Sequence, residues 1–309
     1  MPRCYLGFGL RSVFGLRSVF GLRSVFGLFA TLAVLAGGAA CSDAADASRP
    51  SSPAPFAAGT PGVGAVPSAG TPGVGERPAG TEPSPARLSR VLVFTRTLGY
   101  RHDSIGAGVA ALQKLGAENG FTVDATEDPT RFADATLADY DVVVWLSTTA
   151  DVLDDGQQAA FQRYVQAGGG WVGVHSATDT EYDWPWYGQL IGNDAWFRIH
   201  PPIQTAGLVV EQRDHASTAH LPPSFSLQDE WYNFRANPRA SVNVLLHLDE
   251  SSYAPGDGAM GDHPIAWYHE FDGGRAWYTA LGHRSELYTD PQYTQHLLGG
   301  LRWAAGVAP

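Results

Sequence analysis

The chain of 309 residues predicts an α/β fold in which helices cover both faces of a mostly parallel central sheet, forming a three-layer sandwich. Short apolar runs rich in β-branched residues alternate with segments whose apolar residues recur at helical spacing. Two of these runs, DVVVWL at 141–146 and WVGV at 171–174, are almost entirely apolar, as expected of strands buried on both faces. Glycines follow the helical segments and indicate where each helix ends.

The first half of the predicted domain is a regular alternation of strand and helix. The run RVLVFT at 90–95 is a strand that leads into a helix over 104–119, and a second strand over 121–125 follows Gly120. A helix over 154–167 lies between the two apolar strands and ends at three consecutive glycines. This order predicts a doubly wound, flavodoxin-like sheet.

After Gly192 the pattern changes to short β-rich pieces with longer connections between them. We expect these strands to extend the same sheet and a final helix to close a single domain over residues 89–309. The predicted strands lie at 207–212, 242–248, 265–271 and 276–281, and the helix at 291–305.

Residues 1–41 are typical of an export signal. Three copies of GLRSVF at 9–26 carry arginines, and an apolar run from Phe26 to Ala40 ends in small residues before Cys41. The segment LAGGAAC is similar to a bacterial lipoprotein signal, in which the cysteine becomes the lipid-bearing first residue. We therefore expect a signal peptide of the lipoprotein type, with ordinary export and an intracellular chain as alternatives.

Residues 42–88 consist mainly of Ala, Gly, Pro, Ser and Thr, and AGTPGVG occurs twice, at 58–64 and 69–75. Such a segment has too few large apolar side chains to form a core, so we expect a disordered linker. Its physical role would be to hold the folded domain at a distance from an anchor.

Composition limits the partners. There are 20 basic and 31 acidic residues, a formal net charge of -11, and Lys114 is the only lysine, so a nucleic-acid partner is not expected. Membrane contact is expected only through a lipid on Cys41, and the oligomeric state stays open. Removal of the signal would take away Cys4, and lipidation would occupy Cys41, which leaves no cysteine nucleophile.

Ligands of open α/β sheets bind beyond the carboxyl ends of the strands. The loops at 97–104, 147–155, 175–186 and 283–288 follow predicted strands, and three of the four contain a histidine. These loops are therefore the predicted location of the functional site.

The loop at 175–186 is the most informative of them. It begins with His175 at the end of a buried strand and continues with three carboxylates and three aromatic residues. Carboxylates accept hydrogen bonds from sugar hydroxyls and aromatic rings cover the apolar faces of sugars, so this combination favours a carbohydrate ligand. The alternative is that Asp179 caps a helix and the aromatic residues belong to the core.

Other histidines lie at positions where a structural and a functional role are both open. His283 follows the last predicted strand, His102 precedes the first helix, and His200 and His263 lie in loops beside prolines. A divalent, zinc-like ion could be held by two or three of His102, His175, His200 and His283 with a carboxylate. No close-spaced ligand motif supports this metal site, and the sequence requires no cofactor.

Five segments together resemble the ThuA-like family, named for trehalose utilisation and built on the class I glutamine amidotransferase-like fold. They are GYRHDSI (99–105), GVHSATDTEYDWPWYG (173–188), DEWYNF (229–234), DHPIAW (262–267) and ALGHRSELY (280–288). The resemblance covers nearly all of the predicted domain and implies a sugar ligand, such as a glucoside or keto-sugar. It does not define a reaction.

Comparison with the glutamine amidotransferases refines the chemistry that the resemblance implies. That superfamily places a nucleophilic cysteine in a tight turn after a central strand, whereas here the turn reads GVHSA and His175 stands in its place. Thiol-based amidotransfer is therefore not expected. Two histidines, His175 and His283, would face each other across this position, suited to acid–base work or to metal binding.

We therefore expect an exported, sugar-processing hydrolase, lyase or isomerase in which His175 is the base, His283 its partner acid, and Asp179 and Glu181 orient the substrate. A tethered sugar-binding protein without chemistry and a metal-dependent hydrolase using the same histidines are the alternatives. The expected substrate-binding residues lie in the same loops and motifs: His102, Asp103, Tyr182, Trp184, Trp186, His200, Glu230, Trp231, His263 and Glu286.

Overall fold

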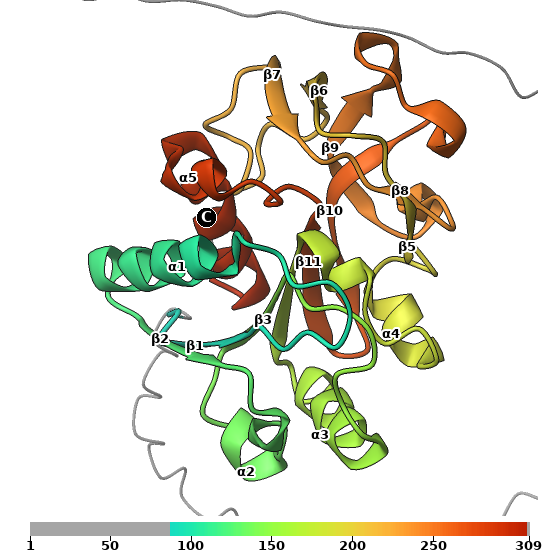
Figure 1. Ribbon diagram of the computed structural model, residues 1–309. Coiled ribbons are helices and arrows are strands. Elements are labelled where there is room, and N and C mark those ends of the chain that lie inside the picture. Colours follow the sequence, from blue (N-terminus) through green and yellow to red (C-terminus); the bar gives the residue numbers. More distant parts are fainter. Residues whose placement is uncertain (1–86, 308–309) are drawn as a thin grey trace, which may run out of the picture. The chain divides into compact units, whose positions relative to one another are not determined.

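The computed structural model describes residues 87–307 (Figure 1). The predicted signal peptide, 1–41, and all but the last two residues of the predicted linker, 42–88, lie outside the described residues. Among the described residues, no helix is both long enough and apolar enough to cross a membrane.

One half of the nine-stranded sheet is parallel, as the alternating sequence pattern predicts. In this half, each strand pairs in parallel with its neighbour, in the order β2-β1-β3-β4-β11. All five residues of β3 and of β4 are buried, in agreement with their continuous apolar sequences. The five strands are β1 (Arg90–Phe94), β2 (Thr122–Thr126), β3 (Val142–Leu146), β4 (Gly170–Val174) and β11 (Gly274–Thr279).

The other half is antiparallel and extends the sheet in the order β11-β10-β9-β6-β7, so the later strands join the same sheet as expected. Strand β11 joins the halves, because it is parallel to β4 and antiparallel to β10. A separate two-stranded sheet pairs β5 with β8. These strands are β5 (Phe197–Ile199), β6 (Gln204–Val210), β7 (Ser224–Asp229), β8 (Asn233–Phe234), β9 (Asn243–Asp249) and β10 (Pro264–Phe271).

Helices α1 and α5 lie together on one side of the sheet and α2 and α3 on the other, which gives the three layers (Figure 1). Helix α1 ends at Gly120, whose φ of 78° is the left-handed conformation that glycine adopts without strain. Helix α3 begins with a capping box between Asp154 and Gln157. The helices are α1 (Ile105–Asn119), α2 (Asp134–Leu137), α3 (Asp155–Gln166), α4 (Pro185–Leu190) and α5 (Pro291–Ala304).

Several short elements are not predicted from the sequence. Helices α2 and α4 are four and six residues long, and β5 and β8 are three and two, too short for a periodic pattern. Strand β7 is an edge strand whose sequence SFSLQD alternates exposed residues with half-buried ones. None of these elements changes the fold class, but β5 contains a residue that lines the site and β7 directly precedes another.

Candidate functional site

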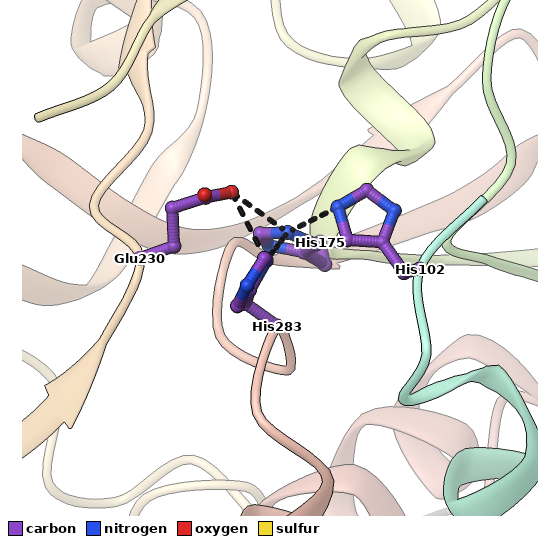
Figure 2. A group of neighbouring side chains, drawn as sticks. All are labelled: His102, His175, Glu230 and His283. Atoms are coloured by element: carbon purple, nitrogen blue, oxygen red, sulfur yellow. Dashed lines mark hydrogen bonds and ion pairs between the residues drawn. The ribbon is translucent and has the colours of Figure 1, made fainter. Parts of the chain in front are cut away.

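Four side chains converge where the carboxyl end of β4 meets the loops around it (Figure 2). His175 follows β4, His283 follows β11, Glu230 follows β7, and His102 precedes α1. One potential ligand atom from each residue lies within 4.8 Å of the others. We call this group the histidine–glutamate cluster.

His175 is at the centre of the cluster. Its φ of 53° is unusual for a residue with a side chain and costs about 1–3 kcal/mol, a strain typical of functional positions. Its Nδ1 lies 2.8 Å from the carbonyl oxygen of Ala280, an acceptor, so Nδ1 carries the hydrogen and donates it. In the neutral ring, Nε2 therefore presents a lone pair, and that atom faces the rest of the cluster.

The distances around this nitrogen are short and similar. Nε2 of His175 lies 3.1 Å from Nε2 of His102, 3.3 Å from Nδ1 of His283 and 3.4 Å from Oε2 of Glu230. The same carboxylate oxygen is 3.1 Å from Nδ1 of His283. Figure 2 shows the four groups pointing toward one common point.

Further residues hold the cluster in place. The buried carboxylate of Asp229 accepts hydrogen bonds from the backbone N–H of Gly282 at 2.8 Å and of Arg284 at 3.2 Å, which fixes the residues on both sides of His283. The second oxygen of Glu230 lies 3.2 Å from Nδ1 of His200. Asp229 and His200 thus orient two members of the cluster without joining it.

The local environment separates the pKa values of the cluster. Burial, reinforced by His175 and His283, lowers the pKa of His102 to about 3. Burial alone would raise the pKa of Glu230, but the neighbouring rings of His175 and His283 outweigh it and hold that pKa well below its usual range. Burial opposes the charged form of His283 as well, yet the hydrogen bond to Glu230 outweighs it and raises the pKa of His283. The protonation of each member therefore depends on the others, and Glu230 stays a charged carboxylate that can bind a cation.

A pocket of about 290 Å³ opens onto the cluster. Asp179 contributes a carboxylate to its wall, and the pKa of Asp179 is raised by burial against the lowering effect of the Tyr182 hydroxyl, which donates a hydrogen bond to it. A larger cavity of about 490 Å³ lies between residues 270–275 and 304–306 and contains none of the predicted site residues. The smaller pocket is lined by Tyr100, His102, Asp179, Phe197, His200, Glu230, Tyr232 and His283.

Comparison with known proteins identifies the domain. The family model described as trehalose utilisation, ThuA, matches residues 90–304. The chain belongs to the ThuA family. A ThuA-like protein of Bacteroides uniformis has a solved structure that is 27% identical, with a TM-score of 0.60, over 74% of this chain and 95% of that one.

A second solved structure, a ThuA-like protein of Parabacteroides merdae, shares the fold. It is 19% identical, with a TM-score of 0.57, over 71% of this chain and 90% of that one. A search of the curated proteins found no match. The family and the mixed α/β fold expected from the sequence are thus confirmed. The chemistry of this ThuA domain is inferred from the geometry of its site.

The aromatic platform expected from the sequence lies elsewhere in the ThuA domain. Trp184 and Trp186 stack on each other at 4.9 Å, away from the pocket lining, and Trp186 donates a hydrogen bond from Nε1 to Asp272. Trp231 is fully buried, with its Nε1 donating to the carbonyl of Gln204. The adjacent residue, Tyr232, lines the pocket instead, because neighbouring residues in an extended segment point to opposite sides.

Glu181 also has a structural position. Its buried carboxylate accepts hydrogen bonds from the backbone N–H groups of Val152 and Leu153, both at 2.8 Å, and from the side chain of Gln158 at 2.6 Å. All of its bonds serve the loop before α3, so Glu181 is not placed to orient a ligand in the pocket. Of the two loop carboxylates predicted to be catalytic, the structure brings only Asp179 to the site.

The remaining predicted substrate-binding residues do not line the pocket. Nδ1 of His263 lies 3.0 Å from Glu250 and its Nε2 2.8 Å from the carbonyl oxygen of Tyr232, so it supports the wall from behind. Asp103 and Glu286 are exposed, and Tyr182 acts through its contact with Asp179. His263 and Tyr182 therefore support pocket residues.

Three pocket residues, Tyr100, Phe197 and Tyr232, are absent from the sequence-based set of site residues. A sequence signal exists for both tyrosines, because Tyr100 lies two residues before His102 and Tyr232 directly follows Trp231, each within a family motif. Phe197 had no such signal, because β5 is too short to be predicted. Two or three of four histidines were expected near a carboxylate, and the structure groups three of them, His102, His175 and His283, with Glu230. His200 lies outside this group.

Proposed function

We propose that this ThuA domain is a carbohydrate-active enzyme whose reaction depends on a divalent transition-metal ion held by His102, His175, Glu230 and His283. The observation that carries the proposal is the convergence of their ligand atoms within 4.8 Å. Three imidazoles and one carboxylate form a donor set suited to ions such as zinc, manganese, iron or cobalt, and less suited to magnesium or calcium.

Hydrogen-bond geometry supports a cation at this point. Because His175 donates from Nδ1 to Ala280, its Nε2 lone pair faces a carboxylate oxygen of Glu230 at 3.4 Å, and two acceptors repel each other unless a positive charge lies between them. Ligands about 2.0–2.2 Å from one ion lie roughly 3.0–3.5 Å from each other, for coordination angles between 90° and 109°. The spacings of 3.1, 3.3 and 3.4 Å around His175 fall in that range.

The surrounding residues can supply the rest of the chemistry. A bound ion in this position would polarise a substrate oxygen or lower the pKa of a coordinated water. Asp179 lines the same pocket with a pKa raised by burial, so it can exchange a proton with the substrate. Nδ1 of His200 lies 3.2 Å from the second oxygen of Glu230, close enough to help orient that ligand.

A sugar is the proposed substrate class. The family description names trehalose utilisation, and the pocket combines acceptor and donor side chains with the rings of Phe197 and Tyr232. The acidic character of Asp179 and Glu230 suits a neutral, hydroxyl-rich ligand such as a glucoside or its keto derivative better than an anionic one. A hydrolase, a lyase and an isomerase all fit this arrangement.

A metal-free mechanism is the second candidate. The contact of 3.1 Å between His283 and Glu230, together with the raised pKa of His283, favours a protonated His283 acting as acid beside His175 as base. The two candidates differ in one measurable property, because the acid–base pair needs no ion. The non-catalytic alternative, a sugar-binding protein, would bind sugars but convert none of them, whether metal is present or not.

Metal analysis combined with a sugar panel tests the proposal. We expect a tag-free domain to purify with about one equivalent of a transition metal, and His175→Ala to weaken metal binding by about a hundredfold or more. Turnover of trehalose, other glucosides or their 3-keto derivatives should be lost on chelation and restored by adding the ion. His220→Ala, which removes a histidine outside the cluster, is the matched control and should change neither property. Turnover that survives complete metal removal would support the acid–base candidate instead.

We also propose that the protein is exported and anchored through a lipid on Cys41, on the basis of the signal-like sequence at 1–41. A Cys41→Ser variant should be released from the membrane fraction and should no longer incorporate a radiolabelled fatty acid. Retention of Cys41→Ser in the membrane fraction, or absence of label in the unmodified protein, would contradict the anchor.

A further inference from the structure

Exposed apolar side chains occur in the chain segments that contribute residues to the pocket. Five large hydrophobic residues are exposed in the part of the chain that the structure describes, and four of them lie close in sequence to pocket residues. Leu98 and Tyr100 precede His102, and Ile199 and Ile203 flank His200. Single exposed apolar residues are ordinary, but four of them within three residues of pocket residues, with Tyr100 in the lining itself, single out these segments as a binding surface.

Tyr100 connects this surface to the pocket. It lines the pocket, and its ring meets that of His102 edge-on with 4.8 Å between the ring centres. Yet 64% of Tyr100 remains exposed, and so does 59% of Leu98. An aromatic residue that lines the pocket and is mostly open to water can take an apolar group that extends out of that pocket.

The backbone that carries these two residues is fixed. Thr149, which is fully buried, accepts a hydrogen bond through its carbonyl from the N–H of Leu98 at 3.0 Å and through its hydroxyl oxygen from the N–H of Gly99 at 3.2 Å. The same hydroxyl donates to the carbonyl of Tyr100 at 2.9 Å. Three bonds to one buried residue thus hold an apolar pair at the surface, so little backbone entropy is lost when a ligand binds there.

We propose that Leu98 and Tyr100 form a subsite for a flat, apolar aglycone of a glucoside whose sugar ring lies against the histidine–glutamate cluster. This inference rests on the proposed function for the position of the sugar. An apolar aglycone is inferred because Tyr100 belongs both to the pocket lining and to the exposed apolar pair with Leu98. Offset or edge-to-face contact between aromatic rings adds to the gain from the area buried, enough to distinguish an aryl from a methyl glucoside.

Calorimetric binding of 4-nitrophenyl and methyl glucosides, each as both anomers, tests the subsite in the full metal-loaded domain. We expect the unmodified protein to bind one aryl glucoside about tenfold more tightly than the matching methyl glucoside. Tyr100→Ala should remove this difference, Tyr100→Phe should keep it, and Leu98→Ala should reduce it. Val209→Ala, at an exposed apolar residue of β6 away from the pocket, is the control and should change nothing.

Several outcomes would overturn the inference. They are equal affinity for aryl and methyl glucosides, loss of both affinities together in Tyr100→Ala, and no binding of either compound. Measuring metal content in the same samples separates this failure from that of the proposed function, since a metal-loaded protein with no aryl preference keeps the metal centre and loses only the subsite. A concentration-dependent dimer that disappears in Tyr100→Ala would assign this surface to a second copy of the chain instead.

Discussion

Two groups of buried histidines in this domain differ in what their ring nitrogens face. His296, on α5, has Nδ1 2.8 Å from the carbonyl of Ser217 and Nε2 3.3 Å from the hydroxyl of Thr279, so a neutral ring satisfies both partners. In the histidine–glutamate cluster, His175 satisfies one nitrogen with a carbonyl and turns the other toward two more imidazoles and a carboxylate.

The difference teaches that burial alone does not mark a functional histidine. His296 and His175 are equally buried, and both follow the rule that buried polar groups find hydrogen-bond partners. What distinguishes the cluster is that potential ligand atoms of three histidines and one glutamate converge on one point. Such a convergence of imidazole and carboxylate atoms can share one cation, as the proposed metal centre requires.

The largest expected effect is on metal affinity, and it should differ between two neighbouring residues, Glu230 and His200. Glu230→Gln should weaken metal binding by about a hundredfold or more, because it removes the charged ligand, whereas His200→Gln should weaken it by about tenfold or less, because His200 only orients Glu230. Competition with a chromophoric chelator measures both affinities. Equal losses in the two variants would place His200 among the ligands and contradict the assignment.

The structural histidine should show the opposite behaviour. His296→Ala should lower the free energy of unfolding by about 3 kcal/mol, since it leaves a cavity and removes the partner of a buried carbonyl, with metal affinity unchanged. Urea unfolding of the chelator-treated protein gives the stability, and the same chelator competition gives the affinity. A His296→Ala variant that unfolds like the unmodified protein would refute the structural role.

Acid should destabilise the domain through these buried rings. Burial lowers the pKa of His296 to about 3 and that of His215 to about 4, while both titrate near 6.5 in the unfolded chain. The unfolded state therefore binds protons first, so this stability is complete above pH 6.5 and is lost as the pH falls toward about 3.

The expected slope is about 1.4 kcal/mol per pH unit for each such histidine inside this window. His296→Gln keeps a hydrogen-bond donor and removes one titrating ring, so its unfolding free energy should fall less steeply between pH 6 and 4. Urea midpoints at a series of pH values measure the slope. Parallel slopes for the two proteins would mean that His296 is protonated in the folded state.

The smallest expected effect concerns the tryptophans. Trp186→Ala should leave metal and glucoside affinities within about twofold of the unmodified protein, because Trp186 stacks on Trp184 and bonds to Asp272 away from the pocket. Its consequence should be a loss of stability, visible as a lower melting temperature. Loss of glucoside binding in a Trp186→Ala variant that remains folded would restore the predicted aromatic platform.

The sequence predicts the parallel half of the fold well because its signals are local. The run 141–146 is apolar on both faces, and Gly120 marks the end of α1. Strand β7 is not among the predicted strands, because its alternating run SFSLQD is short and contains only two large apolar residues. The topological rule that ligands bind at carboxyl ends of strands was sufficient to select His175 and His283.

The rest of the site depends on tertiary packing that the sequence does not encode locally. Asp179 and Glu181 are two residues apart, yet one lines the pocket and the other holds the loop before α3. Likewise, Glu230 joins the cluster and the adjacent Trp231 is buried in the core, a difference set by where β7 ends. The sequence predicts these residues as members of the site, but only the three-dimensional structure shows which of them line the pocket.

Anomalous diffraction from crystals of the tag-free domain grown with cobalt or zinc tests the central claim most directly. Data collected on both sides of the metal absorption edge should show a single strong peak among His102, His175, Glu230 and His283, about 2.0–2.2 Å from one atom of each. A peak only elsewhere, or none at these four residues with millimolar metal present, would contradict the account.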